Sequence, residues 1–429
     1  MTKNVMGDDT PFSTAADYAD PQLSTGSLDD LLRQQLSQSI PSEITAPTEP
    51  EPQSTSLPSC IVDAVSQILN QQTVDITALE PKLVALFDQL NQVYQMADID
   101  PSARKRQFIS RHGLVISPDH CVTTQKDVLR VRSFIRGAHQ AIADLKNRYD
   151  DCLHIVYPAC GPFAPLLLPL IGYYQQKGLY DENDLRLTLI DIQPGAAASL
   201  EAIVHDMGLS GYINEICCQD ACEYQPTTPI HMVVLEAMQH GFSREGHLPM
   251  ARHFAAIMEV DGVFLPQEVV LRAVLNLGQQ EFVEQWRDNS SRLCEANMPQ
   301  DSVDQRVELG DILRLTPSSL RGLTERVLDE NTRLIECGEV VIPPLAQYQD
   351  KPEQPILLIC TQIKTYNDEY LGEYDSGITH PLPDLHVCIN FTPHDAKPGD
   401  LLVQSGDTLK FFYRLNGLPG FLATVGVGS

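Results

Sequence analysis

The sequence predicts an α/β fold, in which a Rossmann-like parallel sheet is followed by a β-barrel or β-sandwich domain. Short apolar runs alternate with helical stretches between residues 151 and 267, and such alternation is typical of a parallel sheet with crossover helices. From Leu357 onward, glycines separate short runs rich in Val, Ile, Phe and Tyr, which indicates an antiparallel β domain. The remaining chain is an N-terminal tail and a helical region.

The N-terminal residues 1–57 are rich in Ser, Thr, Pro, Gln and acids. A segment of this composition cannot bury enough apolar surface to order itself, so we expect a disordered acidic tail. Within the tail, residues 27–36 have a Ser cap and helical apolar spacing, which predicts a short helix that forms only transiently or on a partner.

The next segment, residues 58–150, is predicted to be helical. Apolar residues recur at intervals of three and four over 61–96, and breaks near residues 71–75 and at Pro81 divide this stretch. A further helix is expected over 123–149.

The predicted parallel-sheet domain spans residues 151–267. Its expected strands are 153–157, 185–191, 213–218 and 230–235, and its expected helices include 164–178 and 196–207. In parallel α/β sheets, ligands bind beyond the carboxyl ends of the strands. Residues 268–429 are predicted to form the β-barrel-like domain, with a helical insertion that includes 279–295 and strands from Leu357 to the end.

Composition excludes several classes of protein. The formal net charge of -27 argues against nucleic-acid binding, because phosphate contacts need clustered Lys and Arg. The sequence has no apolar run of about 20 residues and no signal-peptide pattern, so we expect a cytoplasmic protein with no membrane span. The 11 cysteines are expected to be reduced thiols. Two clusters lack the spacing of a metal site, and we expect no metal at either: Cys217, Cys218, Cys222; His380, His386, His394.

Three positions after successive strands predict a nucleoside site. Gly161 and Ala159 lie in the turn after the first strand, where the backbone can approach a ligand. Asp191 ends the second strand, where a carboxylate can hold a ribose diol, and Asp220 follows the third strand, where it can accept from an adenine amino group. Either acid is also a common helix cap or turn residue. The turn lacks the further glycines that a pyrophosphate needs, which favours S-adenosylmethionine over a dinucleotide.

A fourth loop carries two glutamates, Glu236 and Glu245, nine residues apart, with Met238 two residues after the first. In this loop the sequence resembles the protein arginine methyltransferases. Three further stretches are similar to that family in the same order, so that the resemblance covers about residues 100–429: Lys126-Asp-Val-Leu-Arg130; Val260-Asp-Gly-Val-Phe-Leu-Pro266; and two segments of the β domain, Tyr374–Thr379 and Gly406–Tyr413.

The resemblance implies an S-adenosylmethionine-dependent methyltransferase that N-methylates a guanidino or amino group of a small molecule or of protein arginine. The implied cofactor-binding residues are Arg130, which would pair with the cofactor's carboxylate, and Tyr157, Ala159, Gly161, Asp191, Asp220 and Glu236. Glu236 and Glu245 would grip the cationic acceptor and take up its proton, and His240 is an alternative base. The family also suggests a homodimer, with residues 275–330 as an arm.

The chain also departs from the family pattern. Of the glycines in the family's loop only Gly161 is kept, because Tyr157, Ala159 and Phe163 occupy the other characteristic positions. Gln239 replaces a Gly, and Thr379-His-Pro stands in place of Thr-His-Trp. These departures leave two alternatives: a non-catalytic binding or regulatory protein on a methyltransferase fold, and an enzyme that transfers the aminobutyrate group of S-adenosylmethionine.

Overall fold

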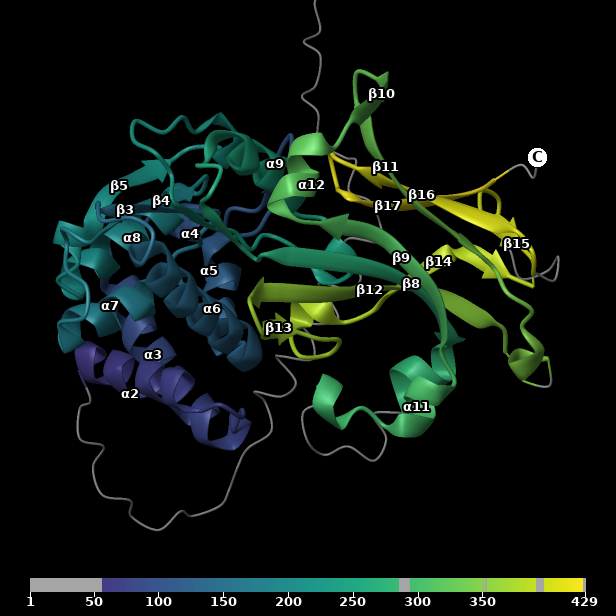
Figure 1. Ribbon diagram of the computed structural model, residues 1–429, viewed down its shortest axis with the longest axis horizontal. Coiled ribbons are helices and arrows are strands. Elements are labelled where there is room, and N and C mark those ends of the chain that lie inside the picture. The colour runs from purple at the N-terminus through teal and green to yellow at the C-terminus, as the bar shows by residue number, and fades with distance from the viewer. Residues whose placement is uncertain (1–55, 285–293, 350, 352, 391–396, 427–429) are drawn as a thin grey trace, which may run out of the picture. The chain divides into compact units, whose positions relative to one another are not determined.

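The computed structural model describes residues 56–284, 294–349, 351, 353–390 and 397–426 (Figure 1). The chain from Thr55 to Ser429 forms one compact unit. The predicted tail up to residue 55, with its short helix at 27–36, lies outside the described residues.

Two long helices open the described chain, and they pack against each other. The predicted break at Pro81 is wrong, since this proline lies inside the second helix. That helix continues past it because it buries Leu79, Leu83 and Leu86 on one face. The predicted helix 123–149 is also interrupted, at Asp127, whose side chain caps the longer part. The elements up to this point are α2 (Leu57–Asn70), α3 (Ile76–Met96), α4 (Pro101–Lys105), β1 (Phe108–Ile109), β2 (Leu114–Val115), α5 (Pro118–Cys121), η1 (Val122–Lys126) and α6 (Val128–Lys146).

The five-stranded parallel sheet confirms the predicted fold class. Its order is β5-β4-β3-β6-β7. The chain therefore builds the sheet outward from β3 to β5 and then crosses back to place β6 on the other side of β3. The predicted helix 164–178 starts later, after Ala164 adopts a left-handed φ of 43°. The elements are β3 (Leu153–Pro158), α7 (Leu168–Lys177), β4 (Leu185–Asp191), α8 (Pro194–Asp206), η2 (Ser210–Tyr212), β5 (Ile213–Cys218), η3 (Ala221–Glu223), β6 (Met232–Val234), η4 (His240–Phe242), α9 (His247–Ile257) and β7 (Val263–Leu265).

Two largely antiparallel sheets follow. One has the order β15-β14-β12-β8-β9, with β13 paired to β12, and the other has the order β10-β11-β16-β17. Their strands are β8 (Glu268–Leu277), β9 (Val307–Leu315), β10 (Glu325–Asp329), β11 (Thr332–Val341), β12 (Pro355–Tyr366), β13 (Glu369–Leu371), β14 (Leu382–Ile389), β15 (Leu401–Val403), β16 (Thr408–Arg414) and β17 (Gly420–Val425). The helical elements among them are η5 (Gln280–Glu284), η6 (Glu295–Asn297), α11 (Gln300–Asp304), α12 (Pro317–Gly322), η7 (Ala346–Tyr348) and η8 (Gly377–Thr379).

Two expectations for this half are corrected. Strands begin at Glu268 rather than at Leu357, because β8 is buried over nearly its whole length and therefore lacks an alternating pattern. Of the helix expected at 279–295, the structure describes a five-residue π-helical turn, η5, and the short turn η6; residues 285–293 lie outside the described part.

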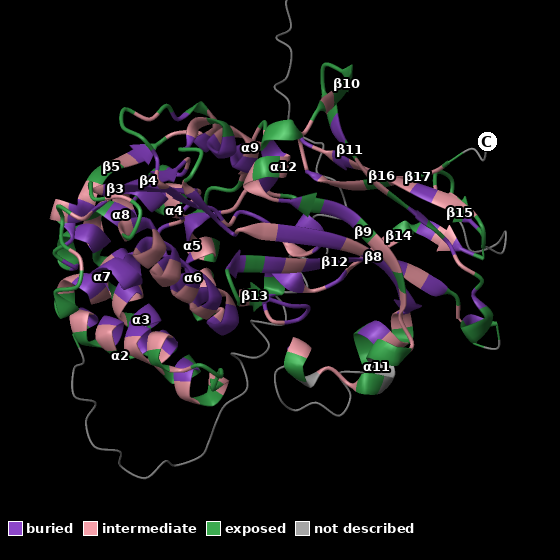
Figure 2. Ribbon diagram, viewed as in Figure 1, coloured by how far each residue is buried: buried purple, intermediate pink, exposed green. Residues whose placement is uncertain are grey.

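Helix α6 joins the two halves of the compact unit. It contacts β7 of the parallel sheet and β12 and β13 of the antiparallel sheet. Ser133 Oγ lies 2.9 Å from Thr365 Oγ1 across this contact, and a methyl group added at Gly137 would stand 3.1 Å from the same threonine oxygen. Figure 2 shows the buried residues running from the parallel sheet into the antiparallel strands. Helix α6 therefore lies at the boundary between the two halves.

Candidate functional site

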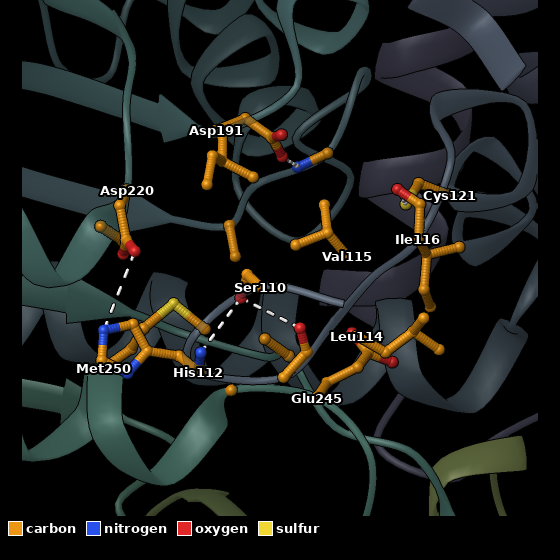
Figure 3. A pocket seen from close by; sticks show the side chains of 17 residues that line it. Ser110, His112, Leu114, Val115, Ile116, Cys121, Asp191, Asp220, Glu245 and Met250 are labelled. Carbon is orange, nitrogen blue, oxygen red and sulfur yellow. Dashed lines mark hydrogen bonds and ion pairs between the residues drawn. The ribbon is translucent and has the colours of Figure 1, made fainter. Parts of the chain in front are cut away.

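A cavity lies at the carboxyl ends of the parallel strands (Figure 3). It encloses about 680 Å³ of empty space, which includes the open solvent at its mouth. Residues that follow β3, β4, β5 and β6 all line it, among them Gly161, Asp191, Asp220 and Glu245. The structure therefore brings together four of the side chains or turns that the sequence singles out.

The turn after β3 forms one wall. Ala159 and Gly161 both line the cavity, and both have left-handed φ angles, of 50° and 65°. That conformation is easy for glycine and costly for alanine, so the turn stores strain at Ala159. Tyr157 does not contribute to the wall. It is 2% exposed within the core, and burial raises the pKa of its hydroxyl.

Asp191 ends β4 and fixes this turn. Its Oδ2 accepts a hydrogen bond from the Gly161 N–H at 2.9 Å, and its Oδ1 accepts one from the Gln193 N–H at 2.8 Å. Burial raises the pKa of its carboxyl to about 6, although both N–H groups oppose the rise. Each carboxylate oxygen accepts about two hydrogen bonds, so Asp191 retains acceptor capacity toward the cavity.

Asp220 begins the turn after β5. Its Oδ1 accepts from the Cys222 N–H at 2.9 Å, and its Oδ2 lies 3.8 Å from His112 Nε2, which also lines the cavity. The two side chains face each other in Figure 3. Asp220 therefore lines the cavity beside His112, which comes from a distant segment of the sequence.

That segment is the β1–β2 hairpin, which forms a wall of the cavity. Its lining residues include Ser110, His112 and Gly113. The Leu114 N–H donates to the Arg244 carbonyl at 2.7 Å, and a methyl group at Gly113 would stand 2.8 Å from the same carbonyl oxygen. The sequence analysis missed this wall, because the hairpin is only a few residues long and precedes the sheet; Gly113 is its one local signal.

Arg130 is not among the residues that line the cavity. Its Nη1 donates to Glu236 Oε2 at 2.8 Å and its Nη2 to Asp127 Oδ2 at 2.8 Å. The two carboxylates raise the pKa of the guanidinium despite its burial. Asp127 also accepts from Ser376 Oγ at 2.6 Å, which ties this cluster to the antiparallel half. The structure thus pairs Arg130 with Glu236, a contact that the sequence analysis did not anticipate.

The two glutamates of the loop differ in their surroundings. The Glu236 side chain is 6% exposed, and its Oε1 accepts from the Met238 N–H at 3.3 Å. Glu245 lines the cavity, and burial together with the charge of Glu236 raises the pKa of its carboxyl to about 8. Arg244, the residue before Glu245, has a left-handed φ of 65°. The loop is therefore strained where it presents Glu245 to the cavity.

His240, the alternative base, does not line the cavity. It lies in η4, where burial and the nearby charges of Arg244 and His380 lower the pKa of its imidazole. Among the described residues, no hydrogen bond or ion pair joins the His240 side chain to Glu245 or Asp191.

No family model matches this sequence, and no curated protein matches it. Among solved structures the chain is similar to the Trypanosoma brucei PRMT1 enzyme–prozyme heterotetrameric complex with AdoHcy, at a TM-score of 0.38 and 13% identity, over 70% of this chain and 95% of that chain. No helix among the described residues is long and apolar enough to cross a membrane. The fold and cavity define a Rossmann-like α/β protein with a cavity at the carboxyl edge of its parallel sheet.

Proposed function

We propose that this chain is an S-adenosylmethionine-dependent methyltransferase that acts on a guanidino or amino nitrogen. One observation carries the proposal. The turn at Gly161, Asp191 and Asp220, which follow three neighbouring strands, line one cavity with Glu245. Gly161 suits a nucleoside because its backbone can approach the ligand closely, and Asp191 and Asp220 suit one because they supply two carboxylate acceptors. Glu245 suits a cation.

The cavity fits the nucleoside part of the cofactor in its donor and acceptor chemistry. Asp191 would accept from the ribose hydroxyls with the acceptor capacity left after its two backbone hydrogen bonds. Asp220 would accept from the adenine amino group through Oδ2. When bound, S-adenosylmethionine supplies an electrophilic methyl group. The chain's own part is to orient both reactants and to exclude water, a positioning effect worth several kcal/mol.

Glu245 is the residue best placed to receive the acceptor. In the absence of a cation its raised pKa, about 8, leaves it mostly protonated at neutral pH. A guanidinium or ammonium group beside it would favour the ionised form, so acceptor binding should release a proton. The Glu245 carboxylate would then hold the acceptor and take the proton that its nitrogen loses as the new bond forms.

Glu236 would have a different role. One of its oxygens is bound to Arg130 and the other accepts from a backbone N–H. It is therefore a positioning residue, which holds Arg130 in place. We accordingly expect substitution of Glu236 to disturb cofactor binding as well as transfer.

The test compares binding with transfer. Calorimetric titration with S-adenosylmethionine should show saturable binding, and labelled cofactor should transfer a methyl group to members of a panel of guanidino compounds, amines and arginine peptides. Glu245→Gln should bind cofactor normally but transfer about a hundredfold more slowly, which is the usual scale for losing an acid–base group. Glu201→Gln, on the exposed face of α8, is the matched control. Absence of cofactor binding would overturn the proposal.

A non-catalytic binding protein is the second candidate. It is favoured by the engagement of Arg130 with two acids and by the strained Ala159 in the loop. The same titration separates the candidates, because a binding protein would take up cofactor without transferring any group. Mass spectrometry of a modified acceptor would separate methyl from aminobutyrate transfer.

A further inference from the structure

Three potential metal ligands meet at the edge of the cavity. His112 comes from the turn between β1 and β2, whereas Asp220 and Cys222 come from the turn after β5. One imidazole nitrogen, one carboxylate oxygen and the thiol sulfur all lie within 4.8 Å of one another. His112 and Asp220 are 24% and 23% exposed, so the group is shielded from solvent yet reachable from the cavity.

The local structure holds two of the three ligands in place. Asp220 Oδ1 accepts from the Cys222 N–H, which leaves Oδ2 directed toward His112. The backbone N–H of His112 donates to Ser110 Oγ at 3.1 Å, and the Ser110 hydroxyl donates to the Gly113 carbonyl at 3.0 Å. The hairpin turn is thus braced where it presents the imidazole to the carboxylate.

The ligand set suits zinc and chemically similar cations. Imidazole nitrogen, thiolate sulfur and carboxylate oxygen are the three kinds of ligand that Zn²⁺ takes, and three protein ligands leave a fourth position open. A carboxylate and a thiolate would balance the charge of a divalent cation. The nearby charged groups, Arg111, Arg333 and Glu223, add one net positive charge, so the attraction for a cation has to come from the carboxylate and thiolate ligands themselves.

We propose that His112, Asp220 and Cys222 bind a divalent cation of the zinc class and that this cation fixes the β1–β2 hairpin to the turn after β5. Binding displaces the thiol proton of Cys222 to solvent. Because His112 and Asp220 line the cavity, the open coordination position lies on its side. A second consequence rests on the proposed function: a cation on Asp220 removes the acceptor for adenine, so metal and S-adenosylmethionine compete.

Cobalt(II) tests the site without any cofactor. Titration of the wild-type chain should produce a thiolate-to-cobalt absorption band, and Zn²⁺ should displace it. Cys222→Ser should abolish the band, and His112→Ala should weaken Zn²⁺ binding at least about tenfold, as loss of a metal ligand normally does. Cys218→Ser is the matched control, since Cys218 is an exposed cysteine at the end of β5, shortly before the turn that carries Cys222, and it should retain the band.

Two results would overturn the site: no band in the wild type, or an unchanged band in Cys222→Ser. Competition is measured separately, by titrating S-adenosylmethionine with and without saturating Zn²⁺. Affinity should fall at least about tenfold in the wild type and stay unchanged in Cys222→Ser. If the wild type binds S-adenosylmethionine equally well with and without Zn²⁺, the proposed competition is wrong, but the metal site is unaffected. Failure of S-adenosylmethionine to bind at all would count against the proposed function, whereas the cobalt spectrum would still decide the metal site.

Discussion

Two groups of carboxylates in and near the site are held in different ways. In the first group, Asp127 and Glu236 are bridged by Arg130 in a largely buried ion-pair cluster. In the second, Asp191 and Asp220 line the cavity and accept hydrogen bonds from backbone N–H groups. Removing the partner of a largely buried ion pair leaves a charge uncompensated, whereas a carboxylate held by the main chain can still bind a ligand. Substitutions in the first group should therefore damage the fold, and those in the second should damage binding.

The largest effect is expected from Arg130→Met. This change leaves two buried carboxylates without their cation and should lower the free energy of unfolding by about 3–5 kcal/mol. Arg314→Met is the matched control, because Arg314 also bridges two carboxylates but is 52% exposed; its loss should cost about 1 kcal/mol or less. Denaturant unfolding of both variants gives the comparison. Equal losses would show that the cluster around Arg130 is no stronger than a surface pair.

Asp191→Ala is expected to act mainly on binding. The variant loses the acceptor of the Gly161 N–H and the proposed acceptor of the ribose, and its affinity for S-adenosylmethionine should fall about tenfold or more, equivalent to roughly 1.5–3 kcal/mol. Asp181→Ala, in the exposed turn before β4, is the control. Calorimetric titration curves that coincide with the wild type would remove Asp191 from the site.

A third effect is a gain of stability that depends on pH. The pKa of Glu245 is about 8 in the folded chain against a usual value of 4.5. Its contribution is therefore fully favourable below about pH 4.5 and is lost as the pH rises toward 8. Glu245→Gln avoids this loss, so it should match the wild type near pH 4.5 and be more stable at pH 8.5, by up to about 5 kcal/mol for a shift of this size. Unfolding curves at the two pH values measure the difference, and a difference that is the same at both would contradict the assignment.

The parallel sheet was predictable from the sequence because its strands are short, apolar and bounded by turns. The expected strand 213–218 matches β5, and the acids after β4 and β5 reach the cavity as the sheet topology requires. What could not be predicted depends on contacts between distant segments. The pairing of Arg130 with Glu236 joins residues on α6 and after β6, and His112 gains its place beside Asp220 only when the hairpin folds over the sheet.

The β1–β2 hairpin has a consequence for dividing the chain. Its Leu114 N–H is bonded to the Arg244 carbonyl, and Gly113 packs against the same carbonyl, although neither residue belongs to the sheet. A shortened chain that starts at Val122 would keep all five parallel strands but would lose α2 and α3, which pack against α7 and α8. It would also have one side of the cavity open to water, so a minimal chain chosen by its sheet alone would have an incomplete site.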